Sequence, residues 1–268
     1  MITTSELLEN QLLENPFQRY SDTRYFYPHL SEQRRVLEVA YGFILDSRDP
    51  AKNLGVITGP SGGGKSVLAQ RLAQTHFQLP GRGSTLGLYL NTNTLTEPRH
   101  FLMAVIETLG LPSTRSNTNR LESIFQRLEE SDDQLLLVLD GPPVDQDYLT
   151  QLSAWSVEHD KKIKTLVFLQ DLNNNTANIG GLNQFLGLYL PFRGSDASEI
   201  ASMLYFRCLM AGHPEPGRLF TEEELTAIGE SARGALAEAL RLAQLALEAK
   251  IKEEKAKLRL TNFRFRHF

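Results

Sequence analysis

Hydrophobic residues near the start of the chain recur with the spacing of amphipathic helices. Four leucines predict a first helix over residues 3–14. This helix should end at Asn15-Pro16, because a proline disfavours a helical conformation of the residue before it. A second helix is expected to open at Ser31, a residue type that caps helix N-termini. The leucines of the first helix are Leu7, Leu8, Leu12 and Leu13, and the apolar face of the second is Val36, Val39, Ala40, Phe43 and Ile44.

The middle of the chain alternates between short apolar runs and helical patterns. The apolar runs predict strands at residues 54–58, 85–90, 135–140, 165–169 and 187–192. Helical spacing between them predicts helices at residues 67–77, 101–109, 121–128 and 148–157. Strands that alternate with helices imply a mainly parallel sheet with helices on both faces, which is an α/β fold.

Only helical patterns follow after residue 195. Helices are expected at residues 197–210, 222–231 and 236–254, and Thr221 with Glu224 has the pattern of a capping box at the start of the second. The segment 192–195 is the expected linker. The whole pattern predicts an α/β core followed by a small helical domain.

Composition is that of an ordinary water-soluble protein and excludes two classes. The 268 residues are 41% hydrophobic and 22% charged, with a mean hydropathy of −0.27. The single cysteine, Cys208, excludes a disulfide framework within the chain. The apolar runs are far shorter than the about 20 residues that a membrane span needs, and the N-terminus lacks the regions of a secretory signal. We therefore expect a cytoplasmic protein without a membrane span.

A glycine-rich loop carries the clearest chemistry. Gly59–Ser66 reads GPSGGGKS and satisfies the P-loop pattern G-x-x-x-x-G-K-[ST] between a predicted strand and a predicted helix. A loop that wraps a polyphosphate must point several backbone N–H groups inward, which requires small residues and positive φ angles. Lys65 would place its charge on the β- and γ-phosphates, and the Ser66 hydroxyl would bind Mg²⁺. The alternative is a glycine-rich turn without a ligand. The predicted ATP-binding residues are Gly59, Pro60, Ser61, Gly62, Gly63, Gly64, Lys65, Ser66 and Val67.

The apolar run Leu135–Leu139 ends in an aspartate, as the Walker B strand of a P-loop protein does. Asp140 is therefore the second predicted magnesium-binding residue beside Ser66, and it is predicted to be catalytic together with Lys65. The alternative is a core strand that ends in an ordinary loop aspartate.

The position after this aspartate departs from an efficient hydrolase. Many P-loop ATPases carry a glutamate there to polarise water, but this chain has Gly141 followed by two prolines. Asp145 is a candidate replacement and Asp147 lies nearby, although solvated loop acids or helix caps would look the same. Without a placed base, in-line attack loses a factor of roughly 10² to 10⁴ in rate. Nucleotide binding is therefore better supported than turnover.

Two polar residues follow the strand predicted at residues 165–169. Ligands of a doubly wound sheet gather at the carboxyl ends of the strands, so Gln170 and Asp171 are candidate sensors of the nucleotide state. Ordinary loop polarity explains them equally well.

Basic residues concentrate at the C-terminus of a chain whose net charge is −4. Residues 250–268 contain seven Lys or Arg against two Glu, and phenylalanines alternate with basic residues from Phe263 to Phe268. Such a segment suits nucleic acid, because it can neutralise phosphates and stack on bases. It also suits a protein partner that takes the phenylalanines, or a solvated helix end with a disordered tail.

In their order along the chain, these features resemble the AAA+ ATPases of the ExeA/GspA type, a group related to the transposition regulators TniB and TnsC. Asn15-Pro16-Phe17 resembles the group's N-terminal motif, and residues 31–42 (SEQRRVLEVAYG) resemble its first helix. Residues 204–228 (LYFRCLMAGHPEPGRLFTEEELTAI) and 231–247 (SARGALAEALRLAQLAL) are similar to its helical lid.

The resemblance implies a P-loop NTPase three-layer sandwich with a parallel sheet of order 5-1-4-3-2 and a small all-helical lid. It implies an N-terminal helix and aromatic segment at 1–30, an AAA+ domain at 31–194, a lid at 195–257 and a basic-aromatic tail at 258–268. It also implies ATP and Mg²⁺ as cofactors, and a homo-oligomeric ring or filament with nucleotide at each interface.

Arginines that the group uses in hydrolysis are absent or displaced in this chain. The segment before the fifth strand, residues 182–186, contains no arginine, although the group usually carries one there. Ala237 occupies the slot of the lid arginine, so Arg233 and Arg241 become the candidate sensors. We expect an ATP-binding AAA+ protein that hydrolyses slowly or only with a partner. The alternatives are a non-hydrolysing regulatory adaptor and a P-loop small-molecule kinase.

Overall fold

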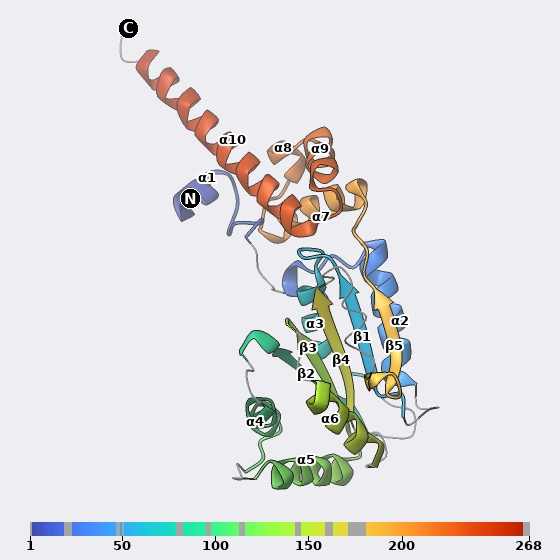
Figure 1. Cartoon of the computed structure of the whole chain (residues 1–268). Coiled ribbons are helices and arrows are strands. Elements are labelled where there is room, and N and C mark those ends of the chain that lie inside the picture. Colours follow the sequence, from blue (N-terminus) through green and yellow to red (C-terminus); the bar gives the residue numbers. More distant parts are fainter. Residues whose placement is uncertain are drawn as a thin grey trace. The chain divides into compact units, whose positions relative to one another are not determined.

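The computed structural model describes residues 2–18, 23–46, 49, 51–78, 83–94, 98–112, 116–142, 146–158, 163–170 and 181–264. The chain divides into two compact units (Figure 1). We call Gln33–Ser61 with Lys65–Arg193 the sheet unit, and Met1–Glu32, Gly62–Gly64 and Gly194–Phe268 the helical unit.

Five parallel strands form the sheet unit in the order β2-β3-β4-β1-β5. This order confirms the 5-1-4-3-2 arrangement that the family resemblance implied. The central strand β4 pairs with β3 on one side and with β1 on the other, so that Gly59 lies opposite Gln170. The strands are β1 (Leu54–Gly59), β2 (Thr85–Asn91), β3 (Gln134–Asp140), β4 (Ile163–Gln170) and β5 (Leu186–Pro191).

Helices cover both faces of this sheet, which makes three layers. Alternate strand residues point to opposite faces, so Leu54 and Val56 face one way and Gly55 the other. Leu54 and Val56 belong to a core cluster that includes side chains of three helices, α4 (Pro98–Thr108), α5 (Asn117–Ser131) and α6 (Gln146–Glu158). On the opposite face, Gly55 lies under Phe43 of α2 (Ser31–Leu45), and Gly87 lies under Ala73 of α3 (Lys65–Gln74).

Most predicted strands and helices are confirmed, with ends that differ by a few residues. All seven residues of β3 are buried, as expected for a strand covered on both faces. Helix α3 begins at Lys65, two residues before the predicted start. The buried Lys164 of β4 was not singled out from the sequence. Its Nζ donates hydrogen bonds to the carbonyls of Phe43 and Asp46 and so caps the end of α2.

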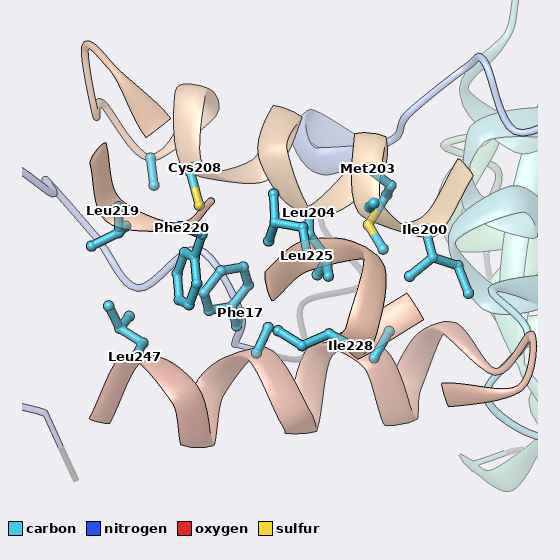
Figure 2. Close-up of a cluster of buried hydrophobic side chains, with 14 of the residues drawn as sticks. Phe17, Ile200, Met203, Leu204, Cys208, Leu219, Phe220, Leu225, Ile228 and Leu247 are labelled. Carbon is cyan, nitrogen blue, oxygen red and sulfur yellow. The ribbon is translucent and has the colours of Figure 1, made fainter. Parts of the chain in front are cut away.

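The helical unit has its own hydrophobic core (Figure 2). Phe17 and Phe220 meet edge to face with ring centroids 5.7 Å apart. The helices around this core are α1 (Thr4–Glu9), α7 (Ala197–Met210), α8 (Pro216–Leu219), α9 (Glu222–Ala232) and α10 (Leu236–Arg264). The expected capping box at α9 is confirmed, because Glu224 N–H donates to Thr221 Oγ1 and Thr221 N–H donates to Glu224 Oε2.

Two helix ends differ more widely from the sequence-based expectation. The helix predicted at residues 3–14 ends at Glu9, because Gln11 takes a positive φ of 58° and the turn buries Leu12 in the core. The last helix was expected to stop at residue 254, but the backbone of α10 continues to Arg264 because no proline or glycine interrupts it. No helix in the described ranges is both long and apolar enough to cross a membrane.

Arg207 fastens the N-terminal segment to α7 inside the helical unit. Its guanidinium is buried and donates to the carbonyls of Pro16 at 2.7 Å and Gln18 at 3.1 Å. It also lies 4.3 Å from the ring centroid of Tyr25, in a cation–π contact. These two hydrogen bonds join the segment after α1 to α7, across sequence separations of 191 and 189 residues.

Candidate nucleotide site

The glycine-rich loop lies between the end of β1 and the start of α3, as the P-loop pattern requires. Gly62 and Gly64 have φ angles of 77° and 99°, which other residues rarely adopt. Gly59 is required for a different reason, since a Cβ there would lie 2.7 Å from the Phe192 carbonyl oxygen. These glycines allow the backbone to turn tightly and leave its N–H groups available to a ligand.

Lys65 and Ser66 open α3, where backbone N–H groups lack partners within the helix. Lys65 is 9% exposed, and its ammonium donates to the carbonyls of Gly59 at 2.8 Å and Pro60 at 2.7 Å. The lysine thus reaches back across the loop that it belongs to. Ser66 is exposed at the same helix end. A cation, a hydroxyl and the positive end of a helix dipole therefore meet at this loop, and all three favour phosphate.

Asp140 ends β3 and is 9% exposed. Its Oδ2 accepts a hydrogen bond of 2.9 Å from the hydroxyl of Tyr89, which belongs to the neighbouring strand β2. Burial raises the pKa of Tyr89 to about 12, and the Asp140 charge raises it as well, against a hydrogen bond with Gln70 that lowers it. Tyr89 therefore remains a protonated donor at neutral pH.

Thr92 fixes the main chain just after Asp140. Its Oγ1 donates to the carbonyls of Asp140 at 3.3 Å and Pro142 at 2.8 Å. Gly141 lies between these two residues with a φ of 132°, and a Cβ there would stand 2.6 Å from Thr92 Oγ1. The position where many P-loop ATPases carry a glutamate is thus shaped for glycine alone.

The remaining candidates in the sheet unit are only partly described. Gln170 is the exposed last residue of β4 and lies beside Gly59 in the sheet, so it reaches the strand end expected for a nucleotide sensor. Asp147 is exposed in the first turn of α6. Asp145 and Asp171 lie outside the described residues.

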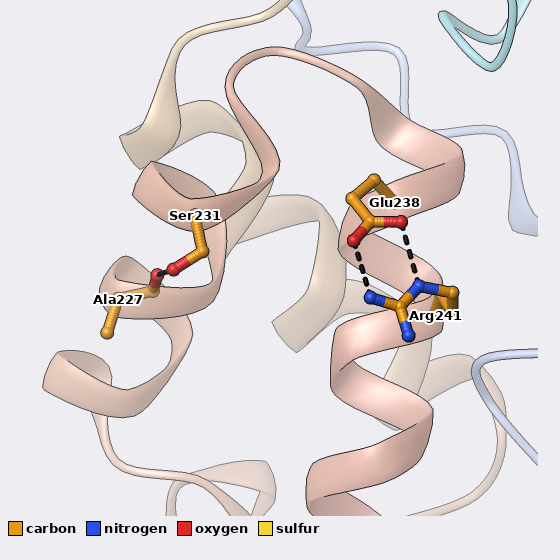
Figure 3. A network of polar contacts seen from close by, with 4 residues as sticks. All are labelled: Ala227, Ser231, Glu238 and Arg241. Atoms are coloured by element: carbon orange, nitrogen blue, oxygen red, sulfur yellow. Dashed lines mark hydrogen bonds and ion pairs between the residues drawn. The ribbon is translucent and has the colours of Figure 1, made fainter.

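The two candidate arginines belong to the helical unit and have different surroundings. Arg233 is exposed and caps α9 with a φ of 49°. Arg241 forms two hydrogen bonds with Glu238 one turn earlier, at 2.8 and 2.6 Å (Figure 3). Ala237, which matches the family's lid arginine, donates its backbone N–H to the Gly62 carbonyl at 2.9 Å within the same unit. The structure thus brings Ala237, rather than either arginine, to a loop residue by a hydrogen bond.

A cavity of about 620 Å³ lies within the helical unit, between the N-terminal segment and α10. Arg241 and Gln244 form one side of it, and Phe17 is on the other. Gln244 donates its Nε2 to Glu248 at 3.0 Å, and its buried Oε1 has no hydrogen-bond donor among the described residues. The cavity is lined by Ile2, Thr4, Leu7, Leu13, Glu14, Asn15, Phe17, Gln18, Arg241 and Gln244.

The residues present suit a magnesium nucleotide. Ser66 at the start of α3 and Asp140 at the end of β3 offer the oxygen ligands that Mg²⁺ prefers. In the part of the chain that the structure describes, no group of three or more His, Cys, Asp or Glu side chains is placed to hold a metal. In nucleotide sites Mg²⁺ usually takes its further ligands from the phosphates and from water.

Comparisons with known proteins agree with this fold. Residues 48–179 match the family model of an AAA domain. Among solved structures, the chain is similar to Cdc6p from Pyrobaculum aerophilum, with a TM-score of 0.62 and 20% identity, over 91% of this chain and 67% of that one. It is also similar to the Orc1 protein of Aeropyrum pernix in complex with DNA, with a TM-score of 0.56 and 20% identity, over 89% and 64% of the two chains.

A third similar structure is Drosophila ORC bound to DNA, with a TM-score of 0.59 and 18% identity, over 90% of this chain and 62% of that one. The chain spans about two thirds of the length of these proteins. No protein of curated function matches it in sequence. The AAA domain match, the strand order and the glycine-rich loop together define the fold as that of the AAA+ class of P-loop NTPases.

Sequence reasoning missed Tyr89 and Thr92 at this site. Both follow from the strand order, which places the end of β2 beside the end of β3. The polar stretch Asn91–Thr94 directly after a predicted strand was the available signal, because ligands gather at that edge of a parallel sheet.

Proposed function

We propose that this chain is an ATP-binding AAA+ protein whose subunits assemble in a nucleotide-dependent way, and that it hydrolyses ATP slowly or only when a partner completes the site. The observation that carries the proposal is the loop Gly59–Ser66, with its two positive-φ glycines and its buried lysine between β1 and α3. Lys65 would bind the β- and γ-phosphates, while Ser66 and Asp140 would hold Mg²⁺. The ion neutralises charge that develops on the phosphates.

Slow hydrolysis is supported by the end of β3. Gly141 leaves no side chain there to polarise water, and its φ of 132° with the close Thr92 hydroxyl excludes one. Asp147 is exposed in the first turn of α6, where a carboxylate suits the helix N-terminus better than the role of a placed base. A missing base costs roughly 10² to 10⁴ in rate. The isolated protein should therefore turn over well below about one ATP per second, a typical lower value for enzymes.

Phosphate release measured beside ATP binding tests this proposal. We expect saturable binding of Mg·ATP with little phosphate release. Turnover of several per second by the unmodified protein would show that the base is present after all. Gly141→Glu alone should not raise the rate of phosphate release, because a Cβ at this position would clash with the Thr92 hydroxyl. The double variant Gly141→Glu, Thr92→Gly removes that hydroxyl, and comparing it with the single variant tests whether the clash is the reason.

Assembly separates the proposal from its alternatives. Sedimentation velocity with a slowly hydrolysed ATP analogue and with ADP should show larger species with the analogue. An adaptor that never cleaves ATP would assemble in the same way but release no phosphate even with its partners. A protein that stays monomeric with both nucleotides would favour the small-molecule kinase.

Partners are proposed from the charge of the C-terminal segment. Residues 250–268 carry seven basic and two acidic residues, and the backbone of α10 continues through most of this segment. The Aeropyrum pernix and Drosophila structures that the chain resembles contain DNA, which favours nucleic acid as one partner to test. Binding to duplex DNA should weaken steeply as salt rises if counterions are released. Binding that is insensitive to salt would favour a protein partner instead. We also propose, from the sequence alone, a cytoplasmic location and membership of the ExeA/GspA group.

A further inference from the structure

Asp140 is a buried carboxylate at the end of β3. In the described ranges it accepts the Tyr89 hydrogen bond and pairs with no Lys or Arg. Burying a carboxylate without a cation is costly, and a neutral hydroxyl offsets only part of that cost. A cation that binds beside Asp140 would offset this cost.

The tyrosine that contacts Asp140 also contacts the helix that follows the glycine-rich loop. The side chain of Gln70 lies close enough to the Tyr89 hydroxyl to lower its pKa. Gln70 lies four residues after Ser66 in α3, so the two side chains share one face of the helix and are about 6 Å apart along its axis. Tyr89 thus stands between the face of α3 that carries Ser66 and the carboxylate of Asp140.

Tyr89 and Thr92 contact different parts of the end of β3: Tyr89 bonds the Asp140 side chain, and Thr92 bonds the main chain. Thr92 bonds the carbonyls on both sides of Gly141 and so fixes the main chain. Tyr89 bonds one oxygen of the Asp140 side chain and leaves the other without a hydrogen-bond donor in the described part of the protein. The rotation of the carboxylate is therefore limited by a single hydroxyl.

We propose that Tyr89 is a positioning residue for magnesium, which orients Asp140 by binding one of its oxygens and leaves the other for the ion or its water shell. This inference rests on the proposed nucleotide function. Groups that orient a metal ligand typically change metal affinity 10- to 100-fold when they are removed. Tyr89 should therefore matter for the magnesium dependence of nucleotide binding and not for nucleotide binding without metal.

The test is a magnesium titration of nucleotide binding with wild type, Tyr89→Phe and Tyr189→Phe. Tyr189 lies on the edge strand β5, is 42% exposed, and serves as the matched control in the same unit. A fluorescent ATP analogue reports binding, first in EDTA and then at increasing Mg²⁺. Tyr89→Phe should need about tenfold more Mg²⁺ for the half-maximal effect, with an unchanged Kd in EDTA and an unchanged value for Tyr189→Phe.

A wild-type magnesium dependence in folded Tyr89→Phe, or an equal shift in Tyr189→Phe, would overturn the inference while leaving the proposed function intact. Failure of wild type to bind the analogue under any condition would overturn both. If Tyr89→Phe does not fold, Gln70→Leu removes the other contact of the tyrosine. A smaller shift in the same direction is then expected, and no shift would contradict the proposal.

Discussion

Gly141 determines what the end of β3 can carry. Its φ of 132° belongs to a region that only glycine populates readily, and Thr92 Oγ1 occupies the space where a Cβ would stand. The backbone conformation at position 141, and not only the residue type, therefore disfavours a glutamate after Asp140. A variant that introduces an acid there changes the fold of the turn together with its chemistry.

Replacing Gly141 by alanine should lower the free energy of unfolding by about 1–3 kcal/mol, because the backbone conformation becomes strained. Urea unfolding followed by circular dichroism measures this. Gly42→Ala is the control, since Gly42 lies within α2 and a Cβ there meets nothing within 4 Å. That variant should be stabilised by roughly 0.5–1 kcal/mol. Equal effects from the two substitutions would argue against strain at Gly141.

His213 gives the helical unit a dependence on pH. It is 7% exposed, and its Nδ1 accepts a hydrogen bond from the Glu215 N–H. Burial lowers its pKa below the ordinary 6.5, against a raising effect of Glu215, while Arg218 lowers it as well. The unfolded chain therefore takes up a proton first as the pH falls, and the contribution of His213 to stability is lost below pH 6.5.

The free energy of unfolding should thus decrease between about pH 7.5 and 5.5. His213→Gln should flatten this decrease, and His76→Gln, which changes an exposed histidine, should not. Urea titrations at the two pH values provide the comparison. A decrease of the same size in His213→Gln would assign the effect to other groups.

Arg207 acts at the scale of elements, because it joins the N-terminal segment to α7. Its guanidinium bonds two carbonyls and contacts the Tyr25 ring while it is only 4% exposed. Lysine has neither the fork of donors nor the flat cation that these contacts use. The position of the residues after α1 therefore depends on the Arg207 side chain, which comes about 190 residues later in the sequence.

Arg207→Met should cost about 3 kcal/mol of stability, because each hydrogen bond from a charged donor contributes roughly 1.5–3 kcal/mol. Arg218→Met is the control, since the Arg218 side chain is 77% exposed and pairs with Glu215 at the surface. That pair is expected to contribute less than about 1 kcal/mol. Thermal unfolding of both variants checks the difference, and equal losses would contradict the role given to Arg207.

At the scale of the whole molecule, the strands of the sheet could be predicted from the sequence, but several side-chain contacts between them could not. The run Leu135–Asp140 predicts a strand because a parallel strand is apolar on both faces, and Gly59–Ser66 predicts a phosphate loop by itself. The Tyr89–Asp140 bond depends on which strands are neighbours, which local patterns do not contain. The early end of α1 depends likewise on Leu12, which packs in a core whose residues come mostly from position 200 onward.

Binding of a slowly hydrolysed ATP analogue with Mg²⁺, measured by calorimetry, tests the central claim that the Gly59–Ser66 loop binds a triphosphate. Wild type should bind at one site per chain, and Lys65→Ala should weaken binding by a factor of about 10 to 100, the loss expected for one charged hydrogen-bond donor. Arg71→Ala, an exposed position on the same helix α3, should bind like wild type. No binding by folded wild type, or equally tight binding by Lys65→Ala, would contradict the account.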